Sequence, residues 1–217
     1  MSLLKIIAQG GWLMIPIVLF SVIAVVLIVN KYIDLNRFKT KSSHILYELK
    51  AFLASGKKDD AINLCTSSQG AIPIVLKEGL LHSHLEKDGI ESYMEAAGTE
   101  QVHLMEKNMS TLATIAGVAP LTGFLGTVTG MISAFMEIQN LGGNVNATVL
   151  AGGIWEALLT TATGLGVGIV AYLFYNYFTA KIHHMAFEIE SNSKQLVDII
   201  LETKKINNPQ QGFRYEN

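Results

Sequence analysis

The chain has 217 residues, of which 50% are hydrophobic and 16% are charged, and its formal net charge is only −2. A typical soluble domain carries about 25% charged residues, so this composition indicates an integral membrane protein rather than a soluble one. The near-neutral charge gives no reason to expect nucleic acid as a partner. A single cysteine, Cys65, excludes an internal disulfide framework and a cysteine-based zinc cluster.

Three apolar segments are long enough to cross a hydrocarbon core about 30 Å thick, which needs about 20 helical residues. We place these spans at residues 12–30, 110–138 and 148–178. The first is too long for the core of a signal peptide and is expected to stay as an anchor. Before the first span we expect a short N-terminal segment (1–11), and between the first and second spans a helical insert (31–107). A short connector (139–147) joins the second and third spans, and a C-terminal helix with its tail (179–217) follows the third.

Basic residues flank these spans unevenly. Lysine or arginine follows the first span, precedes the second and follows the third, whereas the connector at 139–147 has neither. By the positive-inside rule, the N-terminus and this connector lie outside, while the insert and the C-terminus lie in the cytoplasm. The basic residues concerned are Lys31, Arg37, Lys39, Lys41, Lys107 and Lys181.

The insert has the apolar spacing of several short helices. Gly56 indicates the end of a first helix, Asp59 and Asp60 the start of a second, and Pro73 the start of a third. A fourth is expected to run without a break into the second span. The apolar stripe after the third span continues to about Leu201, so the sequence predicts an all-α fold with a helical cytoplasmic extension.

Glu156 is the only charged residue between Ile138 and Ala180. A carboxylate at the centre of a membrane helix costs roughly 2.5 to 3.5 kcal/mol, so it must face protein or water, be protonated, or find a cation. Three threonines of the same helix place hydroxyls on or beside its face, and such a polar stripe could carry protons or other ions. Alternatively, each hydroxyl bonds a carbonyl of its own helix. The threonines are Thr160, Thr161 and Thr163.

Small residues recur in the second and third spans at the spacing that lets helices approach closely. They indicate helix packing or oligomerisation rather than chemistry, and Pro120 is expected to bend the second span. Glu137 is expected to be solvated at the outer end of that span. No nucleophile with a base, phosphate loop or metal-ligand set is visible, so we expect no enzyme activity, cofactor or metal. The glycines are Gly123, Gly126, Gly130, Gly164 and Gly168.

Two long motifs, APLTGFLGTVTGM at 119–131 and GGIWEALLTTATGL at 152–165, resemble the MotA/TolQ/ExbB proton-channel family. The stretch GAIPIVL at 70–76 is similar to the cytoplasmic segment of that family. The three spans and the insert match the ExbB/TolQ branch rather than the four-span MotA branch. The resemblance therefore covers nearly the whole chain, with ExbB the closer of the two.

The resemblance implies a multi-pass protein of the bacterial inner membrane that assembles as a pentameric ring in the lipid. Its second and third spans would line a pore occupied by single-span ExbD- or TolR-like partner helices, and proton flow would drive a TonB-like transducer. Glu156 matches the acid of the family's third span, and Thr127 and Thr161 match its pore-facing threonines. Val170 departs from the pattern, since relatives often have proline there, and a pore helix without that proline is expected to be straighter in its inner half.

Alternative functions remain open at this point. A TolQ-like role in the cell envelope and a motility stator share the same proton chemistry. In a non-conducting scaffold, by contrast, the glycine faces would assemble a ring and Glu156 would hydrogen-bond across a helix interface. Proton and sodium coupling both fit the threonines.

Overall fold

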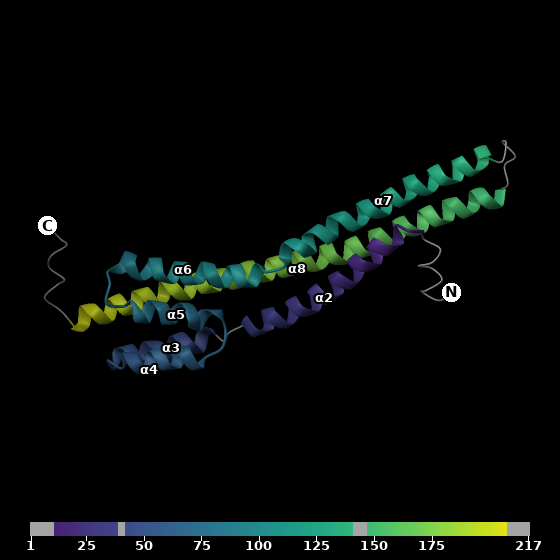
Figure 1. The fold of residues 1–217 in the computed structure, drawn as a ribbon. Coiled ribbons are helices and arrows are strands. Elements are labelled where there is room, and N and C mark those ends of the chain that lie inside the picture. The colour runs from purple at the N-terminus through teal and green to yellow at the C-terminus, as the bar shows by residue number, and fades with distance from the viewer. Residues whose placement is uncertain (1–10, 39–41, 141–146, 208–217) are drawn as a thin grey trace. The chain divides into compact units, whose positions relative to one another are not determined.

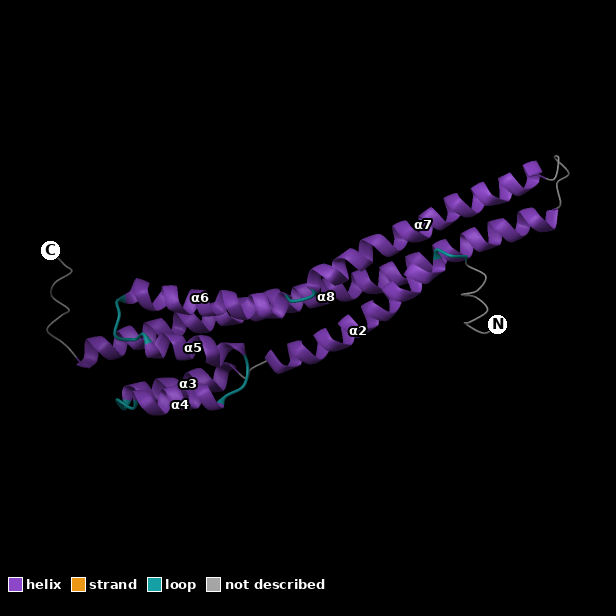
Figure 2. Ribbon diagram, viewed as in Figure 1, coloured by secondary structure: helices purple, strands orange, loops and turns teal. Residues whose placement is uncertain are grey.

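The computed structural model describes residues 11–38, 42–140 and 147–207 (Figure 1). Within these ranges the chain is helical apart from short turns, and no strand occurs (Figure 2). Most of the N-terminal segment and of the connector, and the end of the C-terminal tail, lie outside the described residues. The helices are α2 (Met14–Phe38), α3 (Ser42–Ala54), α4 (Lys58–Ser67), α5 (Ala71–Leu81), α6 (Lys87–Glu106), α7 (Met109–Asn140) and α8 (Ala147–Asn207).

The chain forms two compact units. Unit 1 consists of Met1–Lys31 and Asn108–Phe178, and unit 2 consists of Tyr32–Lys107 and Thr179–Asn217. Because α2 and α8 are continuous across the division, each contributes one part to each unit. In the described part of the chain, three helices are long and apolar enough to cross a membrane, which confirms the all-α membrane architecture that the sequence predicts.

Unit 1 is held together by close packing of α7 against the first part of α8. A Cβ added at Gly164 would lie 2.6 Å from the carbonyl oxygen of Ala119 and 2.9 Å from the Cα of Gly123, closer than real Cβ atoms come. Gly126 faces the side chain of Thr160, and Gly168 faces the ring of Pro120 in the same way. The glycines therefore let two backbones approach within van der Waals distance, which is how membrane helices gain packing energy.

Unit 2 is a bundle of short helices with the C-terminal part of α8. Gly56 adopts φ +72°, and its N–H donates to the carbonyl of Leu53, so α3 ends where the sequence predicts. Asp59 and Asp60 lie in the first turn of α4, where carboxylates are favoured by the helix dipole. The bundle encloses a nearly solvent-free apolar core from several helices, including Leu49, Leu76, Leu80, Ile90, Met94, Ile182 and Leu196.

The end of α8 is fixed to the turn that joins α5 and α6. Lys204 donates from its Nζ to the carbonyl oxygen of Leu85. Burial lowers the pKa of Lys204, and the nearby charge of Lys58 on α4 lowers it further. This hydrogen bond ties the end of α8 to the α5–α6 turn within unit 2.

One prediction about the insert is wrong. The fourth helix of the insert does not run unbroken into the second span, because α6 ends at Glu106 and α7 begins at Met109. Asn108 between them has φ +66°, a left-handed conformation that asparagine tolerates better than most residues. The helix therefore stops at a two-residue turn, and this turn coincides with the division between the units.

Candidate ion-pathway site

Glu156 lies on α8 within unit 1 and lines a pocket of about 210 Å³. The pocket is formed by the start of α2, by α7 and by α8, so three segments that are distant in sequence meet around the carboxylate. Its wall is mixed: it contains hydroxyls and glycine backbone as well as apolar side chains. The lining residues beside Glu156 include Gly11, Trp12, Gly126, Thr129, Ser133 and Thr160.

The hydroxyls of the threonines near Glu156 have different kinds of hydrogen-bond partner. Thr160 is almost fully buried, and its hydroxyl donates to the carbonyl of Glu156 at 2.9 Å, while Thr163 donates to Leu159 at 2.8 Å. These two follow the pattern in which a membrane threonine bonds its own helix one turn earlier. Thr161 instead donates across to the carbonyl of Gly123 on α7, at 2.6 Å. Thr161 therefore links α7 to α8.

Thr127 lies apart from the Glu156 pocket. Its hydroxyl donates to the carbonyl of Phe124 at 2.6 Å, and its side chain lines an open groove on another face of α7. That groove is otherwise mostly apolar, with Val128, Met131 and Phe135 along it. Of the four threonines expected beside Glu156 in an ion pathway, only Thr160 lines the Glu156 pocket in the single chain. A pathway through Thr127 and Thr161 stays a prediction.

Glu137 is the functional candidate that sequence reasoning missed. The sequence predicts that it is solvated at a helix end, and it is indeed exposed near the end of α7, but it also lines the same pocket as Glu156. The two acids come from different helices and are separated by 19 positions in the sequence, so neither spacing nor periodicity indicates their proximity. The feature that brings the two acids together is the antiparallel pairing of α7 with α8, in which Gly130 lies against Ala157.

Gly11 lies against the carboxylate of Glu156. A Cβ added at Gly11 would overlap Oε1 of Glu156, and Gly11 has φ +68°, a conformation that side chains disfavour. The carbonyl of Gly11 accepts a hydrogen bond from the N–H of Met14 at 3.2 Å, which starts α2 at this point. The start of the first span is therefore in direct contact with the acid of the third.

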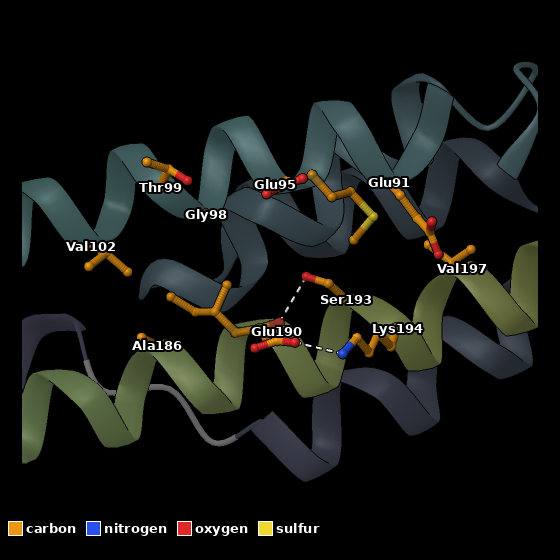
Figure 3. Close-up of a pocket in the computed structure, with 12 residues that line it drawn as sticks. Glu91, Glu95, Gly98, Thr99, Val102, Ala186, Glu190, Ser193, Lys194 and Val197 are labelled. Carbon is orange, nitrogen blue, oxygen red and sulfur yellow. Dashed lines mark hydrogen bonds and ion pairs between the residues drawn. The ribbon is translucent and has the colours of Figure 1, made fainter. Parts of the chain in front are cut away.

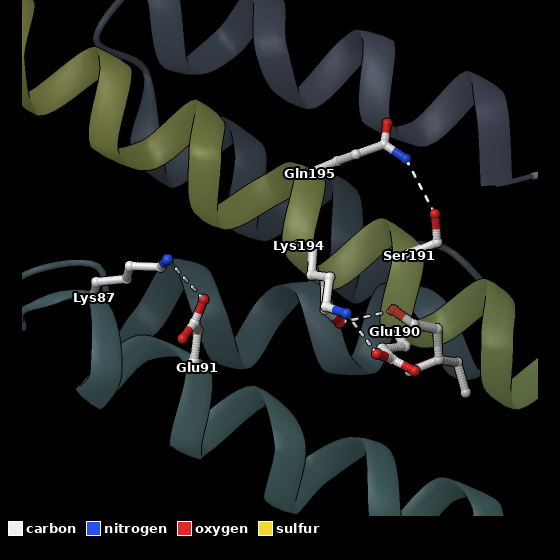
Figure 4. Close-up of polar contacts among 8 residues, drawn as sticks. Lys87, Glu91, Glu190, Ser191, Lys194 and Gln195 are labelled. Atoms are coloured by element: carbon white, nitrogen blue, oxygen red, sulfur yellow. Dashed lines mark hydrogen bonds and ion pairs between the residues drawn. The ribbon is translucent and has the colours of Figure 1, made fainter.

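A second, larger depression of about 600 Å³ lies in unit 2 between α6 and α8 (Figure 3). Its rim carries Glu91, Glu95, Glu190 and Lys194, and the Nζ of Lys194 lies 2.6 Å from Oε1 of Glu190. Glu91 is paired with Lys87 at 3.7 Å (Figure 4). Pairs of this kind, one turn apart on an exposed helix, stabilise it by only a few tenths of a kcal/mol. No residue of the predicted spans lines this groove, which separates it from the candidate pathway.

Comparison with known proteins agrees with this architecture. The MotA/TolQ/ExbB proton channel family matches residues 68–191, which is more than half of the chain and includes Glu156 and all the glycines of the α7–α8 contact. The chain therefore belongs to the MotA/TolQ/ExbB proton channel family. With its three apolar helices, it is a multi-pass protein of the inner membrane.

Relatives carry both ExbB and TolQ names. A biopolymer transport protein ExbB homolog of Methanothermobacter thermautotrophicus is 26% identical over 190 residues, covering 87% of this chain and 67% of the relative. Biopolymer transport protein ExbB-like 1 of Synechocystis is 30% identical over 172 residues, covering 76% of this chain and 66% of the relative. The Tol-Pal system protein TolQ of Pseudomonas aeruginosa is 35% identical over 94 residues, covering 43% of this chain and 40% of the relative. The chain thus spans about two thirds of the first two relatives.

Proposed function

We propose that this chain is an ExbB-like stator subunit that, with an ExbD-like single-span partner, converts proton-motive force into mechanical work on a TonB-like transducer. The N-terminus and the connector face the periplasm, and unit 2 faces the cytoplasm, in line with the positive-inside rule. Its work is ion movement coupled to force rather than a chemical reaction. The driving force is sufficient, because one charge crossing 100 mV releases about 2.3 kcal/mol.

The observation that carries this proposal is the position of Glu156. Its carboxylate lines a pocket with a partly polar wall between the span helices, together with hydroxyls and a second carboxylate. A carboxylate kept only to join helices would be sealed in a dry contact with a donor from the neighbouring helix. The direct link between α7 and α8 is made instead by the hydroxyl of Thr161, which leaves the acid available for protons.

Large apolar side chains on the outside of unit 1 fit assembly into a ring within lipid. Both α7 and α8 expose many of them in the single chain, and a membrane protein can cover such faces with lipid tails or with neighbouring subunits. We propose a pentamer whose α7 and α8 surround the partner helices. The exposed side chains include Leu121, Phe124, Phe135, Trp155, Leu158, Ile169 and Leu173.

A TolQ-like role in the cell envelope is the second candidate, and the similarity to a Tol-Pal system protein favours it. Both candidates use the same proton chemistry and differ in the transducer that receives the work. Deleting the gene and testing both energy-dependent outer-membrane uptake and resistance to detergent separates them. Loss of uptake with an intact envelope supports the ExbB-like role, and the reverse supports the TolQ-like role.

The role of Glu156 is tested in the same cells. Glu156→Gln and Glu156→Ala, at normal protein levels, are expected to abolish the energy-dependent process, because neither side chain can exchange a proton as a carboxylate does. Glu190→Gln is the matched control, since Glu190 is an exposed acid of α8 that lies in unit 2 and pairs with Lys194. Full activity of both Glu156 variants would contradict the proposal.

A further inference from the structure

The pocket around Glu156 contains two carboxylates, and they come from opposite helices of the hairpin. Glu137 on α7 and Glu156 on α8 both line it. The part contributed by the start of α2, Gly11 to Leu13, has no titratable side chain, and the rest of the wall is small, hydroxyl-bearing or apolar. Glu137 is thus the one other titratable group among the residues that line the pocket.

Glu137 lies nearer the end of the hairpin than Glu156 does. It stands three residues before the end of α7 at Asn140, whereas Glu156 lies nine residues inside α8, which begins at Ala147. Both residues are exposed in the single chain. A proton arriving from the water at this end of the hairpin meets Glu137 first. The order of the two acids along the membrane normal therefore suits a relay from the surface inward.

The volume of the pocket that both acids line suits water-mediated transfer. A volume of about 210 Å³ has room for several water molecules, each of which occupies roughly 30 Å³ in the liquid. Ser133 and Thr129 lie on α7 in the same wall, and their hydroxyls donate to the carbonyls of Thr129 and Leu125. Their oxygen lone pairs remain able to accept hydrogen bonds from water.

The segment that starts α2 limits where the carboxylate of Glu156 can go. Because a Cβ at Gly11 would overlap Oε1 of Glu156, the segment that leads into α2 lies against one side of the carboxylate. The side chain of Glu156 lines the same pocket as that of Glu137. Glu137 lies outside both motifs that carry the family resemblance, 119–131 and 152–165.

We propose that Glu137 is the outer proton relay for Glu156. The carboxylic acid of Glu137 releases its proton into the pocket water, and the carboxylate of Glu156 accepts it. Glu137 is left as a carboxylate that a proton from the outer medium neutralises again. This inference rests on the proposed function, in which Glu156 exchanges protons during transport.

Proton flux in vesicles that contain the chain and its native single-span partner tests the relay. Glu137→Gln is expected to lower inward flux by about tenfold or more, because a positioned acid contributes at least that much to proton transfer. A small weak acid such as formic acid, added outside, is expected to restore the flux by occupying the pocket in place of the carboxyl group. The restored flux is counted above the acidification that the same acid causes in vesicles without the chain, because formic acid also crosses lipid by itself. Glu137→Asp is expected to keep most of the flux, and Gln139→Ala, which lines the other groove of α7, is the matched control.

Each outcome distinguishes the relay from the proposed function. Full flux in Glu137→Gln with none in Glu156→Gln overturns the relay and leaves the proposed function standing. Full flux in Glu156→Gln overturns the proposed function itself. Loss of flux in Glu137→Gln that neither formic acid nor Glu137→Asp restores shows a purely structural role and overturns the relay.

Discussion

Gly164→Ala tests the close approach of α7 and α8 directly. The added Cβ would lie 2.6 Å from the carbonyl oxygen of Ala119 and 2.9 Å from the Cα of Gly123. Both obstacles are backbone atoms inside a helix, so no rotamer change can remove them. To restore an ordinary contact of 3.4 Å, the carbonyl oxygen must move away by about 0.8 Å, which separates the two helices at their tightest point.

The expected cost follows from two effects of this separation. Forcing extra volume into a tightly packed site destabilises a protein by typically 1 to 3 kcal/mol. The hydrogen bond from Thr161 to Gly123, now 2.6 Å long, would also lengthen, and bonds of this kind between membrane helices contribute about 0.6 kcal/mol on average. We therefore expect Gly164→Ala to destabilise unit 1 by about 2 to 4 kcal/mol.

A titration with SDS in mixed micelles measures this change, with the fluorescence of Trp12 and Trp155 as the signal. Gly166→Ala is the control on the same helix, because a Cβ added at Gly166 meets no atom within 4 Å. The control should unfold at the same SDS fraction as the unchanged chain or a slightly higher one, because alanine favours a helix over glycine. Gly164→Ala should unfold at a clearly lower one. Equal midpoints for the two variants would refute the inferred backbone contact.

Three further predictions concern single side chains. Thr161→Val removes the hydrogen bond to Gly123 on α7 and should lower the stability of unit 1 by about 0.6 kcal/mol, and at most about 1.7 kcal/mol, in the same SDS titration. Thr163→Val should lower it less, because the hydroxyl of Thr163 donates to Leu159 of its own helix. Burial raises the pKa of Cys65 to about 11, so the contribution of this thiol to the stability of unit 2 should be constant below about pH 9 and fall as the pH rises toward 11, because the thiol ionises first in the unfolded chain. Urea titrations at pH 8 and pH 10.5 measure this fall, and Cys65→Ala should remove it. Gly56→Ala should destabilise unit 2 by about 1 to 2 kcal/mol, because Gly56 has φ +72°, a left-handed conformation that alanine disfavours. The space around Gly56 is open, so no steric clash contributes. An unchanged urea midpoint would show that the left-handed turn is not required.

The sequence predicts most of the helical architecture because local signals set it. Gly56, the aspartates of α4 and the apolar spacing of the insert are read within one or two turns of helix. The sequence does not predict the break at Asn108, because the local signals there are those of a continuous helix. The apolar pattern continues on both sides of it, and a single asparagine is a weak signal for a left-handed residue.

The candidate site was predictable only in part. Glu156 can be singled out from the sequence alone, because it is the only acid in a long apolar segment and a charge in lipid is costly. The pocket around it depends on the register of α7 against α8 and on where the chain enters α2, and neither is encoded by local spacing. For the same reason the sequence could not tell that Thr161 bonds across to α7 while Thr160 and Thr163 bond their own helix.

Proton flux through Glu156 is the most direct test of the central claim. Vesicles that contain the chain with its native single-span partner are loaded with a pH-sensitive dye, and an inward proton gradient is imposed. The account predicts that Glu156→Gln lowers the flux at least tenfold at equal protein content, that Glu156→Asp retains a measurable part, and that Glu190→Gln has no effect. Flux in Glu156→Gln equal to that of the unchanged chain would contradict the account.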